Sequence, residues 1–236
     1  MRIITVANMK GGTGKSTTAH AIITGAAARG RRVLGVDFDV QGNLSYIFGA
    51  DTRKGGAYEL TQGTPAARLI QRTPYGDILT GSINLATITS GGKLKSVLRP
   101  LAARYDVVVV DSAPTLGATL GNALEAATDV LIPLNADPLS LHGLYQVVAT
   151  TRHYNPDAVI LGAFLMRYSP RSIINRNMAD AIKDRCGELG IPFIDTPIRE
   201  GVAVREAQTM QTSLFDYAPK SKPAADFNAL LDAIEI

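Results

Sequence analysis

The stretch Lys10-Gly11-Gly12-Thr13-Gly14-Lys15-Ser16-Thr17 decides the fold of this chain. It follows an apolar run at 3–7 that predicts a strand, and it precedes an alanine-rich run at 18–29 that predicts a helix. A strand, a glycine-rich loop, a lysine, a hydroxyl and a helix in this order are typical of a phosphate-binding P-loop. Such a loop turns backbone N–H groups toward phosphate oxygens, and the helix N-terminus adds the positive end of its dipole.

Each part of this loop has an expected task. Lys15 would neutralise the β- and γ-phosphates, and the Ser16 hydroxyl would bind Mg²⁺. The strict pattern has a glycine where this chain has Met9, so the match is to a variant loop with an additional lysine, Lys10. We expect the phosphates to be held by Gly11, Gly12, Thr13, Gly14, Lys15, Ser16 and Thr17.

The rest of the chain alternates short apolar runs with helical stretches. Strands are predicted at 32–37, 105–111, 129–134, 158–165 and 191–195, and helices at 43–48, 94–104, 116–127, 139–154, 173–189 and from Pro223 onward. Strands that are apolar along their whole length indicate a parallel sheet covered on both faces. The predicted fold class is therefore α/β, a doubly wound mostly parallel sheet with helices on both faces, of the P-loop NTPase type.

We expect one domain that covers residues 1–236. The least regular part is 51–92, which is interrupted by Gly55-Gly56, Thr64-Pro65, Thr73-Pro74 and Gly91-Gly92. We interpret it as an insertion between two strands of the sheet, with short strands near 77–79 and 83–85.

The composition excludes several classes of protein. No apolar stretch approaches the roughly 18 residues of a membrane span, and the 46% hydrophobic content is that of an ordinary globular protein. Cys186 is the single cysteine, which excludes an intrachain disulfide and suits a reducing, cytoplasmic location. The net charge is +3, and residues 53–106 contain eight Lys and Arg against three Asp and Glu. That segment is either a solvated basic face or a contact surface for DNA.

Three carboxylates follow predicted strands. Asp37 ends the run at 32–37, Asp39 follows two residues later, and Asp111 ends a run of four valines. Ligands of open α/β sheets bind beyond the carboxyl ends of the strands, so these side chains should meet the P-loop there. Asp111 fits the Walker B carboxylate that holds Mg²⁺, Asp37 would support the metal or the loop, and Asp39 would position the attacking water. The predicted metal residues are therefore Ser16, Asp37 and Asp111.

With these residues in place, the chain resembles the ParA/MinD family of deviant Walker A ATPases, and in particular its ParA branch of plasmid and chromosome partitioning proteins. The resemblance covers nearly the whole chain. It rests on the Lys-Gly-Gly-Thr-Gly-Lys-Ser-Thr loop, on Asp37-Phe38-Asp39-Val40-Gln41-Gly42-Asn43-Leu44, on Asp111-Ser112-Ala113-Pro114-Thr115-Leu116-Gly117, on residues 133–144, on Arg205-Glu206-Ala207 and on the tail at 216–222. One departure is Val40, because the family has a proline after the second aspartate.

The resemblance implies an ATPase that hydrolyses ATP to ADP and phosphate, with ATP and Mg²⁺ as cofactors. ATP would drive a homodimer in which Lys10 reaches the partner's phosphates, so that Lys10, Lys15 and Asp39 are the catalytic residues. Met166, Arg167 and Pro170 would lie near the adenine. The ATP dimer would bind DNA without sequence preference and associate with the nucleoid, and a ParB-type partner would stimulate the slow hydrolysis. The arginines expected to contact DNA are Arg171, Arg176, Arg199 and Arg205.

Three alternatives stay open. A MinD-like ATPase that cycles on a membrane needs a basic amphipathic tail, but residues 223–236 contain three acidic residues and neither Lys nor Arg. A metabolic P-loop enzyme, such as an ATP-dependent carboxylase or amide-forming synthetase, would share the fold. An ATP-gated scaffold or localisation factor would bind the nucleotide with negligible turnover.

Overall fold

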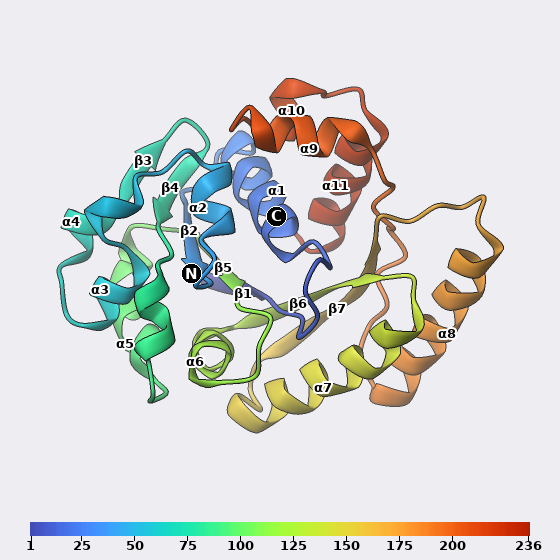
Figure 1. Ribbon diagram of the computed structural model, residues 1–236, viewed down its shortest axis with the longest axis horizontal. Coiled ribbons are helices and arrows are strands. Elements are labelled where there is room, and N and C mark those ends of the chain that lie inside the picture. The colour runs from blue at the N-terminus through green and yellow to red at the C-terminus, as the bar shows by residue number, and fades with distance from the viewer.

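A seven-stranded sheet with the order β3-β4-β2-β5-β1-β6-β7 organises the chain in the computed structural model, which describes residues 1–236 (Figure 1). All neighbouring strands pair in parallel except β3 and β4, which form an antiparallel edge. The predicted doubly wound, mostly parallel sheet is confirmed. The strands are β1 (Arg2–Val6), β2 (Val33–Phe38), β3 (Gln71–Thr73), β4 (Gly76–Leu79), β5 (Val107–Ser112), β6 (Asp129–Asn135) and β7 (Val159–Met166).

Helices connect the strands and cover both faces of the sheet (Figure 1). The longer ones are α1 (Lys15–Ala28), α6 (Ala118–Ala126), α7 (Pro138–Tyr154), α8 (Ile173–Leu189), α9 (Val202–Thr209) and α11 (Lys222–Ala233). The shorter ones are α2 (Asn43–Ile47), α3 (Ala57–Thr61), α4 (Ala66–Leu69), α5 (Lys93–Leu98) and α10 (Leu214–Tyr217). Three 3₁₀ turns are η1 (Thr52–Lys54), η2 (Ile83–Thr87) and η3 (Arg99–Ala103). None of the helices is both long enough and apolar enough to span a bilayer.

The valines of β5 show why the sheet is covered twice. Val107 and Val109 point into a cluster with α1 and α11, whereas Val108 and Val110 point into a cluster with residues of α3 and α5. A third cluster joins β6 and β7 to α6, α7 and α8. Because successive side chains of a strand alternate between faces, one run of β-branched residues contributes to two cores.

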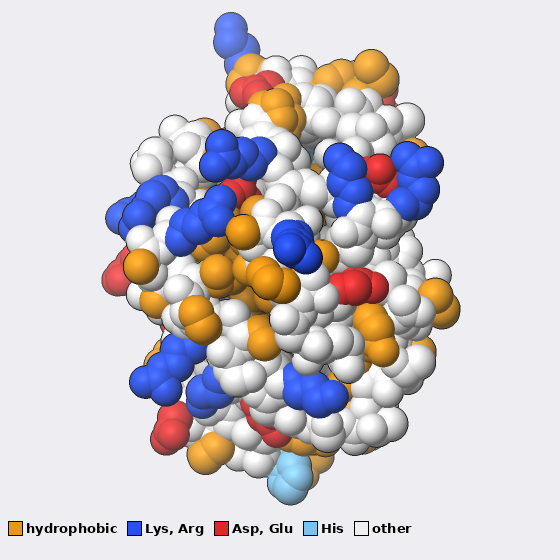
Figure 2. Space-filling model, turned by 90° about the vertical axis from the view of Figure 1, so that its left-hand side faces the viewer, with side chains coloured by type: hydrophobic (Ala, Val, Ile, Leu, Met, Phe, Trp, Pro, Cys, Tyr) orange, Lys and Arg blue, Asp and Glu red, His pale blue; other side chains and the backbone are white.

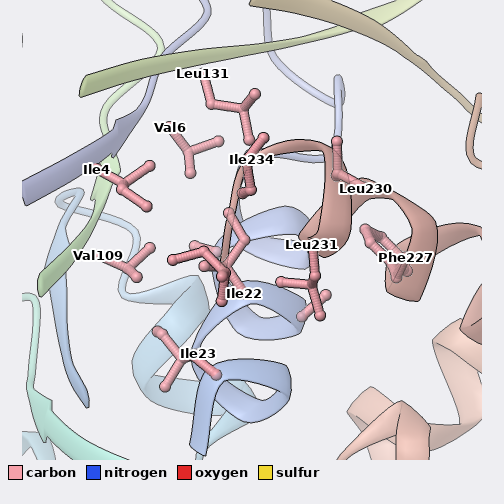
Figure 3. Packing of buried hydrophobic residues seen from close by; sticks show 14 of the residues in the cluster. Ile4, Val6, Ile22, Ile23, Val109, Leu131, Phe227, Leu230, Leu231 and Ile234 are labelled. Atoms are coloured by element: carbon pink, nitrogen blue, oxygen red, sulfur yellow. The ribbon is translucent and has the colours of Figure 1, made fainter. Parts of the chain in front are cut away.

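The C-terminal helix α11 belongs to the core (Figure 3). Its residues Phe227, Leu230 and Leu231 are at most 1% exposed and pack with Ile22 of α1 in one cluster. The apolar face of the amphipathic helix predicted after Pro223 therefore packs against α1 and the sheet.

Two predicted strands are wrong. Residues 191–195 make one isolated bridge, Ala163 to Phe193, because Pro192 has no N–H with which to continue a ladder along β7. Residues 83–85 lie in the 3₁₀ turn η2, which buries Leu85, and Ile88 is buried three residues later, directly after the turn. The predicted strand near 77–79 is β4, and the predicted helix at 94–104 changes from α5 to η3 at Arg99, directly before Pro100.

Candidate active site

The glycine-rich loop connects the carboxyl end of β1 to the start of α1. Gly12 and Gly14 have φ angles of 73° and 87°, in the left-handed region that residues with a side chain seldom adopt. A Cβ atom on Gly14 would also lie 2.6 Å from Cε of Met166, at the end of β7. The tight turn predicted for this loop therefore depends on glycine at these two positions.

Asn8 fixes the beginning of the loop, although it was not among the predicted site residues. Its buried Nδ2 donates to the carbonyl oxygen of Pro133 in β6 at 2.6 Å, and its Oδ1 accepts from the N–H of Lys10 at 2.9 Å. One buried amide thus ties the loop to a neighbouring strand. The sequence shows only that Asn8 is a polar residue after a predicted strand. That pattern does not reveal that its side chain contacts β6.

The two lysines of the loop have different surroundings. Lys15 is buried, and its Nζ donates to the carbonyl oxygen of Lys10 at 3.1 Å. Burial lowers the pKa of Lys15, and the negative charges of Asp111 and Asp39 oppose that shift. The side chain of Lys10 is 31% exposed, and its Nζ lies 2.6 Å from Oδ2 of Asp137, the N-cap residue of α7. Lys15 therefore lies inside the site, whereas Lys10 lies at its edge.

Asp37 and Asp111 are ladder partners at the ends of β2 and β5, and both are fully buried. Oδ2 of Asp37 accepts from the N–H of Ser45 at 2.7 Å and from its hydroxyl at 2.6 Å. Burial raises the pKa of Asp37 to about 6, which outweighs the lowering effect of the Ser45 hydrogen bonds. The carboxyl of Asp37 is thus already held by α2, which suits a supporting position.

Asp111 has no such partner. Neither of its carboxyl oxygens accepts a hydrogen bond. Burial and the negative charge of Asp37 raise the pKa of Asp111 well above its usual value, while the neighbouring Ser16 hydroxyl and Lys15 ammonium lower it. A buried carboxylate without a partner is costly, and a cation beside it removes that cost.

The residues present fit Mg²⁺ at this position. Mg²⁺ at a triphosphate takes few protein ligands and completes its shell with phosphate oxygens and water. No group of three or more His, Cys, Asp or Glu side chains in the chain is arranged as a metal site of its own. Ser16 and Asp111 therefore match a cation that shares its coordination with bound phosphates.

Asp39 lies on the loop that follows β2 and is 5% exposed. Its Oδ1 accepts from the N–H of Gln41 at 3.1 Å, and Gly42, with φ 64°, leads into α2. Gly81 lies close to this loop, because a Cβ atom there would be 2.6 Å from the carbonyl oxygen of Asp39. The N–H of Gly81 also donates to the Ser45 hydroxyl at 2.9 Å. The 51–92 segment thus contacts both strand-end aspartates of β2.

A cavity of about 750 Å³ extends from the glycine-rich loop to α9. Met166 and Arg167, predicted near the adenine, line it together with residues 198–201, whereas Pro170 does not line it. Gln208 of α9 also lines the cavity, and its Nε2 donates to the Thr17 hydroxyl at 2.9 Å. A cavity of this size, lined by the glycine-rich loop, by other polar residues and by a few apolar side chains such as Met166 and Ile198, suits a nucleoside triphosphate.

The four arginines predicted to contact DNA have different surroundings. Arg199 and Arg205 line the nucleotide cavity, and Nη2 of Arg199 lies 2.5 Å from Oδ1 of Asp226. Arg176 donates to the carbonyl oxygen of Pro170 at 2.7 Å, and Arg171 is exposed.

The fold and this site define a P-loop nucleotide-binding protein. The family described as an AAA domain matches residues 1–158. The chain is 32% identical to the chromosome partitioning protein ParA of Myxococcus xanthus, over 97% of this chain and 86% of that protein. It is 31% identical to the chromosome-partitioning ATPase Soj of Thermus thermophilus, over 99% of this chain and 95% of that protein.

Solved structures agree with this assignment. Cobyrinic acid a,c-diamide synthase from Mycobacterium smegmatis with bound ADP and magnesium has a TM-score of 0.85 at 31% identity, over 100% of this chain and 94% of that chain. The septum site-determining protein MinD of Pyrococcus horikoshii with Mg-ADP has a TM-score of 0.85 at 26% identity, over 99% and 96% of the two chains. The chain therefore belongs to the ParA/MinD family of P-loop ATPases. It is an ATPase with ATP and Mg²⁺ as its cofactors.

Proposed function

We propose that this protein is a Mg-ATP-dependent dimerising ATPase that binds DNA without sequence preference and positions it together with a ParB-type partner. The observation that carries the proposal is the position of Lys10, which lies at the edge of its own site and pairs with Asp137. A cation in that position adds little to its own phosphate site and is available to a second copy of the chain. We further propose that residues 1–236 act as one ATPase domain.

The proposed hydrolysis needs positioning and charge neutralisation more than covalent chemistry. The loop at 11–17 would hold the phosphates, with Lys15 against the β- and γ-phosphates. Ser16 and Asp111 would hold the cation, and Asp37 would support it through Ser45 and α2. Bound Mg²⁺ neutralises charge that develops on the transferred phosphoryl group. Asp39 would orient the attacking water, since it is the strand-end carboxylate on a loop.

The dimer would complete this site. On ATP binding, Lys10 of one subunit would leave Asp137 and approach the phosphates of the other subunit. A cation supplied in trans is absent until the dimer forms, so hydrolysis would depend on dimerisation, as with an arginine finger. This dependence would make the basal rate slow and would give a ParB-type partner a step to stimulate. DNA association would place the protein on the nucleoid.

Two alternatives are less well supported. The M. smegmatis protein is named as an amide-forming synthase, whereas the two curated relatives reported above, of similar identity, are partitioning proteins. A membrane-cycling role would need an exposed apolar face on the C-terminal helix, and Phe227, Leu230 and Leu231 are buried.

The test is binding of arbitrary duplex DNA in the presence of ATP or ADP, measured at several salt concentrations. We expect binding with ATP that weakens steeply as salt rises, and little binding with ADP. Hydrolysis without any DNA binding at low salt would favour the metabolic alternative. Nucleotide binding with neither turnover nor DNA binding would favour the scaffold.

A further inference from the structure

The positive charge of this protein is concentrated in one segment. Residues 53–106 hold eight Lys and Arg against three Asp and Glu, whereas the remainder holds sixteen against eighteen. The segment is thus +5 within a chain of net charge +3, and the remainder is −2. Figure 2 shows the side of the molecule that carries β3, α4 and α5, and blue Lys and Arg side chains clearly outnumber red Asp and Glu side chains on it.

Most of these cations have no partner within the protein. Arg53 pairs with Asp51 at 2.8 Å, and Arg104 lies 3.9 Å from Asp77. The other six make neither an ion pair nor a side-chain hydrogen bond, and all but Lys93, which is half-buried, are exposed. We call these six residues the basic face: Lys54, Arg68, Arg72, Lys93, Lys95 and Arg99.

The fold holds the basic face in place. The Gln71 side chain accepts from the N–H of Asp51 at 3.0 Å and donates to its carbonyl oxygen at 2.8 Å, which fixes η1, with Lys54, to the start of β3, with Arg72. The Oδ1 of Asn122 accepts from the N–H of Lys93 at 3.0 Å and fixes the start of α5. The cations therefore extend from structured elements. The fold holds these positive charges near one another although no acidic side chain pairs with them.

The leucines of the two helices that contribute to the basic face point into the core, although apolar side chains also lie among the cations in Figure 2. Leu94 and Leu98 of α5 are fully buried, and Leu69 of α4 is 3% exposed. An amphipathic helix that enters a bilayer needs such residues on its outer side. α4 and α5 thus bury their leucines and offer their cations to solvent, which suits a contact with a polyanion in which Lys and Arg replace condensed counterions on phosphates.

We infer that the phosphate backbone of duplex DNA binds to the basic face, on the 53–106 segment, and not to the arginines of the C-terminal half. This inference rests on the proposed function, because it names the surface through which that function would be exercised. In the C-terminal half, Arg199 is compensated by Asp226 and Arg205 lines the nucleotide cavity. Their positive charge is therefore used within the protein or at the nucleotide.

The test compares two triple variants with the same change in net charge. One variant is Arg68→Gln, Arg72→Gln and Lys95→Gln on the basic face. Its matched control is Arg171→Gln, Arg176→Gln and Lys183→Gln, on and before α8. Each is measured with ATP on a duplex of arbitrary sequence over a series of salt concentrations, after circular dichroism and thermal unfolding have verified the fold.

We expect the basic-face variant to bind about 10- to 100-fold more weakly than wild type. Its slope of log affinity against log salt should be smaller by about 2 to 3, because each lost phosphate contact removes about 0.9. The control variant should keep the wild-type slope. If the triple variant does not fold, each single variant should lower the slope by about 0.9.

Three results would overturn the inference, and they can be told apart. Wild-type binding that survives in the basic-face variant but is lost in the control would move the DNA surface to the C-terminal half and leave the proposed function intact. Wild-type protein that binds no DNA at any salt concentration would contradict the proposed function itself. Binding to vesicles that contain phosphatidylglycerol, lost in the basic-face variant while DNA binding persists, would assign the face to a membrane.

Discussion

Lys10 and Asp137 form an ion pair across the edge of the nucleotide site, with 2.6 Å between Nζ and Oδ2. Asp137 also caps α7 by accepting from the N–H of Ser140 at 3.1 Å. Burial alone would raise the pKa of Asp137, but its hydrogen bond to Lys10 and the charge of that lysine lower it. The pair therefore connects the extra lysine of the loop to the start of α7 in the single subunit.

Asp137→Asn should favour the ATP dimer. Asparagine still caps the helix, but it removes the negative charge that holds Lys10 within its own subunit. The pair is about one-third exposed, contributes about 0.5–1 kcal/mol and opens in both subunits, so the dimer dissociation constant should fall by about 5- to 30-fold. Sedimentation velocity with a nonhydrolysable ATP analogue measures this. The control is Glu188→Gln, which removes the exposed pair with Arg185 and should change nothing. A weaker dimer in Asp137→Asn would contradict the holding role.

Two helical glycines should respond in opposite ways to alanine. In α1, a Cβ atom at Gly25 would overlap Cδ1 of Leu231, so Gly25→Ala should lower the free energy of unfolding by about 1–3 kcal/mol. In α8, nothing lies within 4 Å of a Cβ atom at Gly187, so Gly187→Ala should raise it by about 0.5–1 kcal/mol. Urea unfolding measures both. Equal effects would contradict the close approach of α1 and α11.

Asp37 should make stability depend on pH. Its pKa is raised from 3.8 to about 6, so the folded state retains a proton that the unfolded chain has already lost. This carboxyl therefore lowers the free energy of unfolding as pH rises from about 4 through 6. Asp37→Asn removes this pH-dependent contribution to the free energy of unfolding. Between pH 5 and 7 its stability relative to wild type should rise by about 1 kcal/mol in nucleotide-free urea unfolding. A relative stability that falls over this range would contradict the buried, proton-retaining carboxyl.

The core of the site could be predicted because it follows from chain order and sheet geometry. A loop after β1 and aspartates at the carboxyl ends of β2 and β5 meet because the parallel strands end at one edge of the sheet. Asp37 and Asp111 are direct ladder partners for this reason.

Contacts between distant segments could not be predicted in this way. The partners Lys10 and Asp137 are 127 residues apart, and Asn8 reaches a carbonyl of β6. Residues 83–85 and 191–195 have apolar patterns that fit a strand, a 3₁₀ turn or a single bridge equally well. Their conformation depends on whether a neighbouring strand can pair with them, which the local sequence does not encode.

The trans role of Lys10 is the central claim, and mixing two inactive variants tests it most directly. Lys10→Ala keeps Asp39, and Asp39→Ala keeps Lys10, so a mixed dimer has one site with its own Asp39 and the partner's lysine. Phosphate release from an equimolar mixture should recover to about a quarter of the wild-type rate, although each variant alone is inactive. A mixture as inactive as its components, with dimers verified by sedimentation, would contradict the claim.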